Sequence, residues 1–386
     1  MDFLKSLRLN NVGWLEILFA AYPIFTVYRY PYVPFSLLML LVMDIIALHH
    51  KKKRMLNDAS DKVLKLLFGY VLIHEFLLMF VIGIPGVMIS KYIEYIIIFA
   101  SFFIIYPRID IDKLEGSINW IAIVSMVGLV YHFIAIKAGG PVYPLRIPFL
   151  PEMDKASKIY VAIERPTSFY YEPQHYCSFM MIPLFLSLVR KESIVWSFLI
   201  VLSMFLSTSS YGIIVSILMF AIYAFLQKMS VFKRVLIVVT GGVLVALLLF
   251  SSLFGAGVDK IENTDVERTS RLYNGPTLLM NLKTQDMILG VPDISVSDYY
   301  FHGGVGAAPL IEKDDNVYLP SIYLILAKFG IVCLILYLLT YFLPIARCRD
   351  ILYLSLPLFT GLFINPDSLG SQYAFYMIFI YAYSSR

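Results

Sequence analysis

A run of charged and aromatic residues, ERPTSFYYEPQHY, stands directly before the apolar segment 176–189. Pro173 suits the first turn of a helix, so the spacing predicts that Glu172 lies beside a helix N-terminus. A carboxylate there can complement the helix dipole, or it can act as a general base toward a hydroxyl group. Arg165, earlier in the same run, adds a guanidinium that can bind an anion.

Two arginines in a second polar region, Arg268 and Arg271, are three residues apart. In a helix both guanidiniums would lie on one side, a spacing that suits a fork around a phosphate. Pairing with the neighbouring carboxylates of Glu262, Asp265 and Glu267 is an equally open interpretation.

Four hydroxyl residues in a row, 207–210, interrupt a long apolar stretch in the sequence LSTSSYG. A polar break at membrane depth requires burial in protein or contact with a water-filled cavity. The break is therefore either a tight turn between two helices or a place where Thr208 and Ser209 contact a substrate.

A further polar cluster, DDNVYLP at 314–320, leads into the apolar segment 322–342. It offers Asn316 and Tyr318 as candidate substrate contacts. Lys328 follows about two turns inside the segment, where a cation needs a partner, a cavity or a route to the interface.

Other ionisable residues stand inside apolar segments, namely Asp44, His74 and Glu75. Helix packing is the favoured interpretation, and His74 and Glu75 are expected on different sides of their helix. Asp110 and Asp112 form an Asp-x-Asp pair on a short loop, which does not predict a metal site. We expect no metal and no other cofactor. The cysteines lack metal-ligand spacing and are expected to be inert packing residues: Cys177, Cys333 and Cys348.

The composition requires membrane helices to hold these residues. Of 386 residues, 59% are hydrophobic and 15% are charged, whereas a soluble domain is about 45–50% apolar and about 25% charged. Because nothing in a bilayer satisfies exposed backbone groups, the apolar blocks are predicted to be helices. We expect an all-α polytopic membrane protein, a single domain over residues 1–386, with about twelve transmembrane helices. The predicted blocks are 14–28, 32–48, 63–84, 89–106, 118–136, 176–189, 194–206, 211–226, 235–254, 322–342, 351–364 and 373–383.

Lysine and arginine collect in alternate loops, which predicts that the N-terminus lies inside. Arg29 and Lys91 are the basic residues of the short outer turns, and the net charge of +4 reflects this topology rather than nucleic acid binding. Pro23 interrupts the first block and no small-residue cleavage site follows, so a membrane helix is expected there, not a cleaved signal peptide. Two long segments, 137–175 and 255–320, then lie outside, and loops of this length are usually functional or disordered.

These motifs together resemble the Wzy-type O-antigen polymerases and the related O-antigen ligases, over roughly residues 165–338. The resemblance rests on Arg-x6-Glu-Pro ahead of a span, Thr-Ser-Ser-x-Gly between two spans, an arginine pair in a late outer loop, and Asn-x-Tyr ahead of the next span. It implies a glycosyltransferase of the bacterial inner membrane with a GT-C-like helical core and two long extracytoplasmic loops. Such enzymes act on undecaprenyl diphosphate-linked oligosaccharides without metal or nucleotide. Membrane lipid is a further expected partner, and a chain-length regulator is a candidate.

The residues fit this chemistry. A glycosyl diphosphate donor needs its departing diphosphate stabilised, which fixed arginines can do without a divalent ion, and Arg165, Arg268 and Arg271 are the candidates. The acceptor hydroxyl needs a base; Glu172 matches the Glu-Pro position of the family, and His175 is the alternative. Attack opposite the leaving group would invert the anomeric centre. Sugar rings could contact tyrosines at the outer rim: Tyr170, Tyr171, Tyr176, Tyr299 and Tyr300.

Two further functions share this composition. The ligases, which transfer a finished glycan to lipid A core in lipopolysaccharide synthesis, typically have a histidine before the late asparagine. This chain has Asp315 there, which favours a polymerase, although His302 lies upstream and a folded loop could present it. A flippase would concentrate polar residues near the midplane, whereas here they lie at the outer rim. A partner-binding membrane subunit would leave the arginine placement unexplained.

Overall fold

The computed structural model describes residues 7–30, 33–51, 58–82, 86–139, 145–152, 165–190, 194–226, 270–291, 296, 319–365 and 369–386. Within these residues the regular secondary structure is helical, and β pairing is limited to two isolated bridges. The prediction of an all-helical chain is confirmed for this part. The helices are α2 (Trp14–Phe25), α3 (Phe35–Leu48), α4 (Ala59–Ile82), α5 (Gly86–Ile105), α6 (Ile111–Lys137), α8 (Pro173–Arg190), α9 (Ile194–Leu206), α10 (Ser210–Leu226), α13 (Ser270–Asn281), α14 (Thr284–Leu289), α16 (Ser321–Phe342), α17 (Leu352–Gly361) and α18 (Ser371–Ser384), with short 3-10 turns η3 (Leu343–Ala346) and η4 (Arg349–Ile351).

Eleven of the twelve predicted apolar blocks coincide with a helix, and the ninth, 235–254, lies outside the described residues. Among the described residues four stretches are long and apolar enough to cross a membrane: Ala59–Phe80, Met88–Ile105, Ile111–Lys137 and Ser321–Ala346. The exposed side chains of α4 support lipid as its solvent. They are large and apolar and recur on one face, as a helix in contact with lipid requires: Leu66, Ile73, Leu77 and Phe80.

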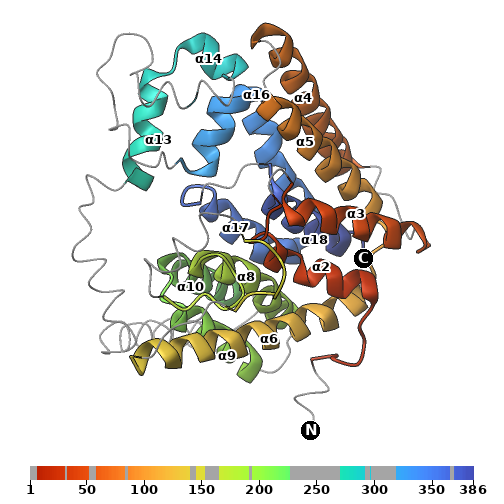
Figure 1. Ribbon diagram of the computed structural model, residues 1–386, viewed down its shortest axis with the longest axis vertical. Helices are drawn as coiled ribbons and strands as arrows, with labels where there is room; N and C mark the ends of the chain where they lie inside the picture. The colour runs from red at the N-terminus through yellow and green to blue at the C-terminus, as the bar shows by residue number, and fades with distance from the viewer. Residues whose placement is uncertain are drawn as a thin grey trace.

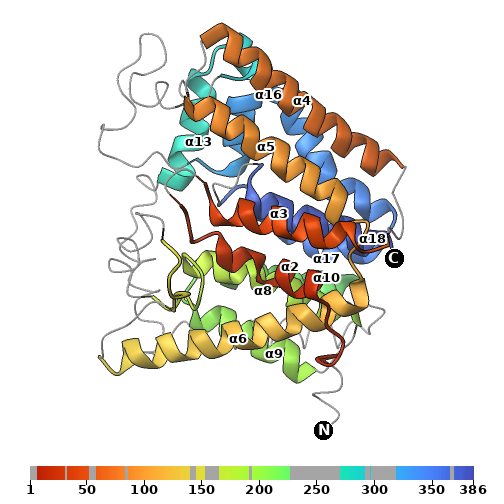
Figure 2. The ribbon, with the colours of Figure 1, turned by 45° about the vertical axis from the view of Figure 1, so that its right-hand side comes forward.

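The helices form a bundle around α8 and α18. Figure 2 shows α3 between α2 and α5, with α6 packed against α2 on its other side, and α8 packs against α6, α9 and α10. Every residue from Tyr373 to Tyr383 of α18 is buried. Phe375 lies between the ring of Phe19, 5.0 Å away, and the ring of Phe179, 6.3 Å away. Such ring pairs contribute about 0.5–1.5 kcal/mol each beyond their buried area, so aromatic packing fixes α2, α8 and α18 together.

One end of the bundle is held by a cluster of ion pairs. The buried carboxylate of Glu115 bonds to Arg8 over 3.1 Å, to Arg386 over 3.2 Å and to Arg190. Asp112 adds pairs of 3.0 Å with Arg8 and with Arg386. These contacts join the start of α6, the end of α8 and the residues after α18, all of which the charge pattern predicts on the same side. Asp112 therefore pairs with arginines in this structure.

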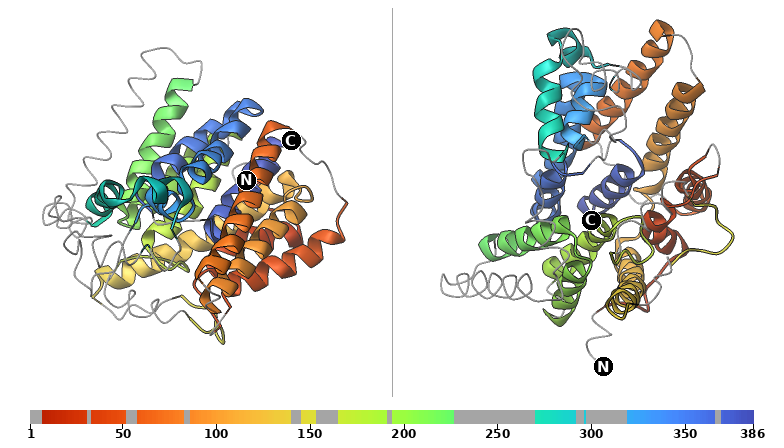
Figure 3. Two further views of the ribbon diagram at one scale, coloured as in Figure 1. Left: turned by 90° about the horizontal axis from the view of Figure 1, so that it is seen from above. Right: turned by 60° about the vertical axis from the view of Figure 1, so that its left-hand side comes forward.

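The helix α16 is broken in its middle, where a continuous span was predicted. Gly330 has φ 76° and ψ 178°, outside helical geometry, and the end of α14 packs into the break. A Cβ on Gly330 would lie 2.1 Å from the carbonyl oxygen of Ile288, so glycine is required there. The backbone N–H of Val291 donates to the carbonyl of Ala327 over 2.7 Å. Figure 3 shows α13 and α14, in teal, lying beside this half of α16 in both views.

The neighbouring helix α4 completes this arrangement. The hydroxyl of Tyr70 donates to the carbonyl of Phe329 over 2.9 Å, which satisfies a backbone group at the break. His74 Nε2 lies 2.7 Å from the carbonyl oxygen of Leu289, and its Nδ1 lies 3.9 Å from a carboxylate oxygen of Glu75. The expectation that His74 and Glu75 face different sides is therefore wrong, because rotation of the two side chains brings their tips together. Figure 1 shows α4, α14 and α16 meeting at one corner of the molecule.

Candidate functional site

The structure brings Arg165 to the turn between α9 and α10. Its Nε donates to the hydroxyl of Thr208 over 3.0 Å, and its Nη2 donates to the carbonyl of the same residue. Thr208 has φ 56°, a left-handed conformation that a bulky residue adopts only where its surroundings hold it. Two motifs that are 43 residues apart in the sequence thus form one structural unit.

The rest of the hydroxyl turn packs onto α8. Ser207 Oγ lies 3.1 Å from the sulfur of Cys177 and donates to the carbonyl of Met204 over 2.6 Å. Ser209 accepts a hydrogen bond from the backbone N–H of Gly212 over 3.4 Å, as a residue capping α10 does. Ser207 and Ser209 are buried, whereas Thr208 is half-buried and Ser210 is exposed, so protein encloses only part of the polar break. A direct contact of Thr208 and Ser209 with a substrate stays a prediction.

The helix α8 begins at Pro173, as the spacing predicts, and Glu172 immediately precedes it. The backbone carbonyl of Glu172 accepts from the N–H groups of His175 over 3.0 Å and Tyr176 over 3.3 Å. Its carboxylate is half-buried and has no hydrogen-bond partner among the described residues. Burial raises the pKa of the neighbouring Tyr171, and the Glu172 carboxylate raises that pKa further. The phenol of Tyr171 therefore stays protonated at neutral pH, so it can donate a hydrogen bond but not take up a proton.

His175 lies one turn into α8. Its ring meets the ring of Tyr171 edge-on, with centroids 5.8 Å apart. Its Nδ1 is enclosed and has no hydrogen-bond partner among the described residues, and the same holds for the hydroxyl of Ser178. An enclosed polar atom left unpaired costs about 1–3 kcal/mol, so two such atoms side by side indicate a place where water or a ligand binds.

Two of the predicted sugar-contacting tyrosines have a different role. Tyr170 and Tyr176 are fully buried, and their hydroxyls bond to Ser125 over 3.1 Å and to Ser203 over 2.7 Å. Their rings meet edge-on with centroids 5.8 Å apart. They anchor the segment before α8 to the bundle, and neither offers a ring face to a sugar in this structure. Tyr171 is half-buried and keeps that possibility.

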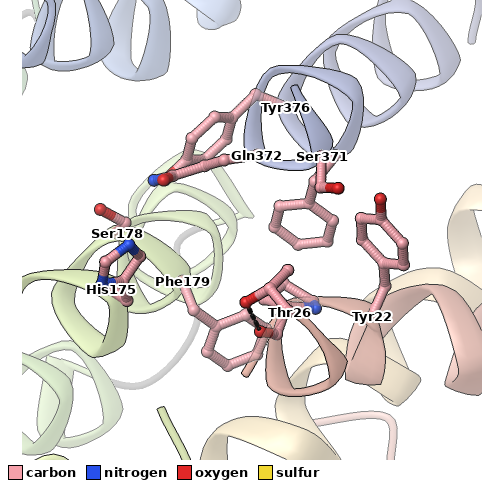
Figure 4. A pocket seen from close by; sticks show the side chains of 10 residues that line it. Tyr22, Thr26, His175, Ser178, Phe179, Ser371, Gln372 and Tyr376 are labelled. Atoms are coloured by element: carbon pink, nitrogen blue, oxygen red, sulfur yellow. Dashed lines mark hydrogen bonds between the residues drawn. The ribbon is translucent and has the colours of Figure 1, made fainter. Parts of the chain in front are cut away.

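A pocket adjoins this segment. It lies between α2, α8 and α18, has a volume of about 30 Å³, and is lined in part by the side chains of His175 and Ser178 (Figure 4). This pocket could not be predicted from the sequence, because small polar and aromatic residues are common in membrane helices and carry no signal at their spacing. The lining residues are Tyr22, Pro23, Thr26, His175, Ser178, Phe179, Ser371, Gln372, Phe375 and Tyr376.

Of the remaining predicted site residues, the structure describes only a part. Lys328 lies two residues before the break in α16. The structure describes the backbone of Arg271, in α13, which packs against α16, but not its side chain. That Arg165, Arg268 and Arg271 meet around one diphosphate stays a prediction. Five residues lie outside the described part of the chain: Arg268, Tyr299, Tyr300, Asn316 and Tyr318; so do His302 and Asp315.

Neither a metal site among the described residues nor a similarity to known proteins assigns a function to this site. Within the described residues no three His, Cys, Asp or Glu side chains are grouped as metal ligands would be. All three cysteines are free; Cys177 and Cys333 are buried and Cys348 is partly exposed. No protein-family model matches the chain, and no curated protein and no solved structure matches it. The function must therefore be argued from the site itself.

Proposed function

We propose that the chain is a polymerase of lipid-linked oligosaccharide repeat units. It would be an inverting, metal-independent glycosyltransferase on the outer side of the bacterial cytoplasmic membrane. The observation that carries the proposal is the contact of Arg165 with Thr208 beside the first turn of α8. That contact fixes a guanidinium on the segment that leads into α8, in which Glu172 and His175 are the next ionisable side chains apart from tyrosines.

The proposed reaction moves a growing glycan from undecaprenyl diphosphate to a hydroxyl of an incoming lipid-linked repeat unit. A base, Glu172 or His175, takes the proton of that hydroxyl. The oxygen attacks the anomeric carbon, a new glycosidic bond forms, and the bond to the diphosphate breaks with its electron pair leaving on the diphosphate. Arg165 would stabilise this charge, and because two of its N–H groups are already held, its guanidinium would need little reorganisation.

The described helices support a location in a membrane. About twelve spans remain the expected topology, and four described helices are long and apolar enough for them. The ion cluster around Glu115 gathers chain ends that the charge pattern predicts inside, whereas Arg165 and Glu172 belong to a segment predicted outside. A GT-C-like arrangement, the undecaprenyl carrier and a chain-length regulator belong to the proposal.

One observation favours a second candidate, a transporter of lipid-linked oligosaccharides. Discontinuous helices commonly line transporter substrate sites, and α16 is discontinuous at Gly330, two residues after Lys328. The polar atoms at this break already have partners from α4 and from the end of α14, which favours a structural role. An O-antigen ligase would use the same donor chemistry and differ in its acceptor.

The test is reconstitution of the purified protein in liposomes with a lipid-linked repeat unit. A polymerase yields a ladder of products on a gel, whereas a ligase adds glycan only when lipid A core is supplied. A transporter moves the lipid-linked sugar between leaflets and forms no bond. Arg349→Lys is a suitable control variant, because Arg349 is exposed and has no described ion pair. Absence of any new glycosidic bond, with sugar moved between leaflets, would reject the proposal in favour of the transporter.

A further inference from the structure

The pocket between α2, α8 and α18 is lined mainly by apolar surface with a few polar groups, and none of its lining residues is Asp, Glu, Lys or Arg. Four rings and a proline provide apolar surface, and hydroxyl, amide and imidazole groups provide hydrogen-bond donors and acceptors. A sugar ring has the same two kinds of surface, C–H groups on its faces and hydroxyls around its edge. An anion such as diphosphate would find no cation among these residues.

Two of the side chains that line this pocket each carry a polar atom with no hydrogen-bond partner among the described residues. His175 Nδ1 and Ser178 Oγ are enclosed, unpartnered among the described residues and three residues apart on α8, so both lie on one face of that helix. Neighbouring hydroxyls of a sugar can each donate and accept, and so can satisfy an imidazole nitrogen and a serine hydroxyl together. Figure 4 shows Gln372 and Tyr376 reaching in from α18 on the opposite wall. The amide nitrogen of Gln372 lies 3.4 Å from the Tyr376 hydroxyl.

We propose that this pocket binds the hydroxyl-bearing edge of an uncharged sugar ring and forms the acceptor subsite beside Glu172. The enclosed volume of about 30 Å³ has room for about two water molecules, so one edge of the ring enters and the remainder lies toward the opening. Glu172 directly precedes α8, three residues before the lining residue His175, and its carboxylate is the proposed base for a sugar held in this subsite. The role as acceptor subsite rests on the proposed function; the binding of sugar does not.

The binding is tested without turnover by thiol protection. Gln372→Cys is introduced in protein with Cys177→Ser and Cys333→Ala. Native Cys348, which directly precedes η4 and does not line the pocket, is kept as an internal control. The probe is the repeat-unit oligosaccharide of the same strain, released from its lipid by mild acid, and the reagent is methyl methanethiosulfonate. At ten times the dissociation constant, labelling of the introduced cysteine should slow about tenfold while Cys348 is unaffected. Inorganic diphosphate at the same concentration should not protect.

The role in the reaction is tested by kinetics with labelled lipid-linked donor and the free oligosaccharide as acceptor. Gln372→Leu and Ser178→Ala each remove one uncharged hydrogen bond, so the acceptor KM should rise about threefold to tenfold with little change in kcat or in donor binding. Thr360→Val is the matched control, because Thr360 in α17 does not line this pocket and its hydroxyl already donates to the carbonyl of Leu356 over 3.1 Å.

The outcomes separate the two proposals. Protection of the introduced cysteine without any product ladder keeps the sugar pocket and rejects the transferase. A ladder with no protection and unchanged acceptor KM overturns the pocket and keeps the transferase. Protection by diphosphate as strong as that by oligosaccharide would also overturn the sugar pocket, because its lining residues include no Lys or Arg to bind an anion. If Ser178→Ala does not fold, Gln372→Leu decides, since Gln372 is only half-buried.

Discussion

The guanidinium of Arg165 holds both the hydroxyl and the carbonyl of Thr208, and so fastens the segment before α8 to the turn between α9 and α10. The contact can serve two purposes at once. It stabilises a turn whose central residue has a left-handed backbone, and it fixes the plane of a side chain suited to bind a diphosphate. The two purposes predict different responses to substitution.

Arg165→Lys should lower the rate of glycan transfer by about a hundredfold or more, because lysine keeps the charge but loses the planar fork. Arg271→Lys should be similarly impaired if its side chain shares the diphosphate. The measurement is the initial rate of ladder formation in liposomes at equal amounts of folded protein, with Arg349→Lys as control. Near-normal rates in both variants would mean that charge alone is sufficient, and the clamp would have to be abandoned.

Glu172→Gln should bind the lipid-linked donor normally yet turn over about a hundred to ten thousand times more slowly, the range expected when a general base is removed. Single-turnover kinetics after a separate binding measurement will distinguish the two steps. His175→Ala separates the two candidate bases, because it removes the imidazole and leaves the carboxylate of Glu172 in place. A normal rate in Glu172→Gln beside a folded, inactive His175→Ala protein would transfer the base to His175.

Glu115→Gln should destabilise the bundle by about 1–3 kcal/mol, because the buried carboxylate neutralises three arginines that are themselves partly exposed. Asp112→Asn should cost less than about 1 kcal/mol, since Asp112 is half-exposed and its pairs are screened by water. Thermal denaturation in detergent compares the two. Equal losses in the two variants would show that burial of Glu115 does not set the strength of this cluster.

Gly330→Ala should disrupt the packing of α14 on α16, because the new Cβ would lie 2.1 Å from the carbonyl oxygen of Ile288. Gly69→Ala in α4 is the matched control: nothing lies within 4 Å of its Cβ position, and alanine in a helix is favoured over glycine by about 0.8–1.0 kcal/mol. Melting temperature should fall for the first and rise or stay level for the second. A Gly330→Ala protein as stable as the parent would mean that α16 is continuous.

Helix positions could be predicted from the sequence because apolar length is a local property. Pro173 also gave the start of α8 correctly, since proline restricts its own backbone. The bond between Arg165 and Thr208 could not be predicted, because it depends on how α8, α9 and α10 pack. The pocket could not be predicted either: Gln372 and Ser178 become a pair only when α18 lies against α8. Gly330 and Gly69 look alike in the sequence, and only the approach of α14 distinguishes them.

The release of undecaprenyl diphosphate by purified protein, counted against new glycosidic bonds, addresses the proposed reaction without assuming any particular sugar. In buffer with EDTA, wild-type protein should release one undecaprenyl diphosphate for each glycosidic bond formed. Glu172→Gln should bind the same lipid-linked repeat unit, but the amount of undecaprenyl diphosphate that it releases in the same time should be at least about a hundredfold smaller. Bonds that form only after Mg²⁺ or Mn²⁺ is restored would contradict metal independence. No release by folded wild-type protein that binds the lipid-linked repeat unit would contradict the proposed transferase altogether.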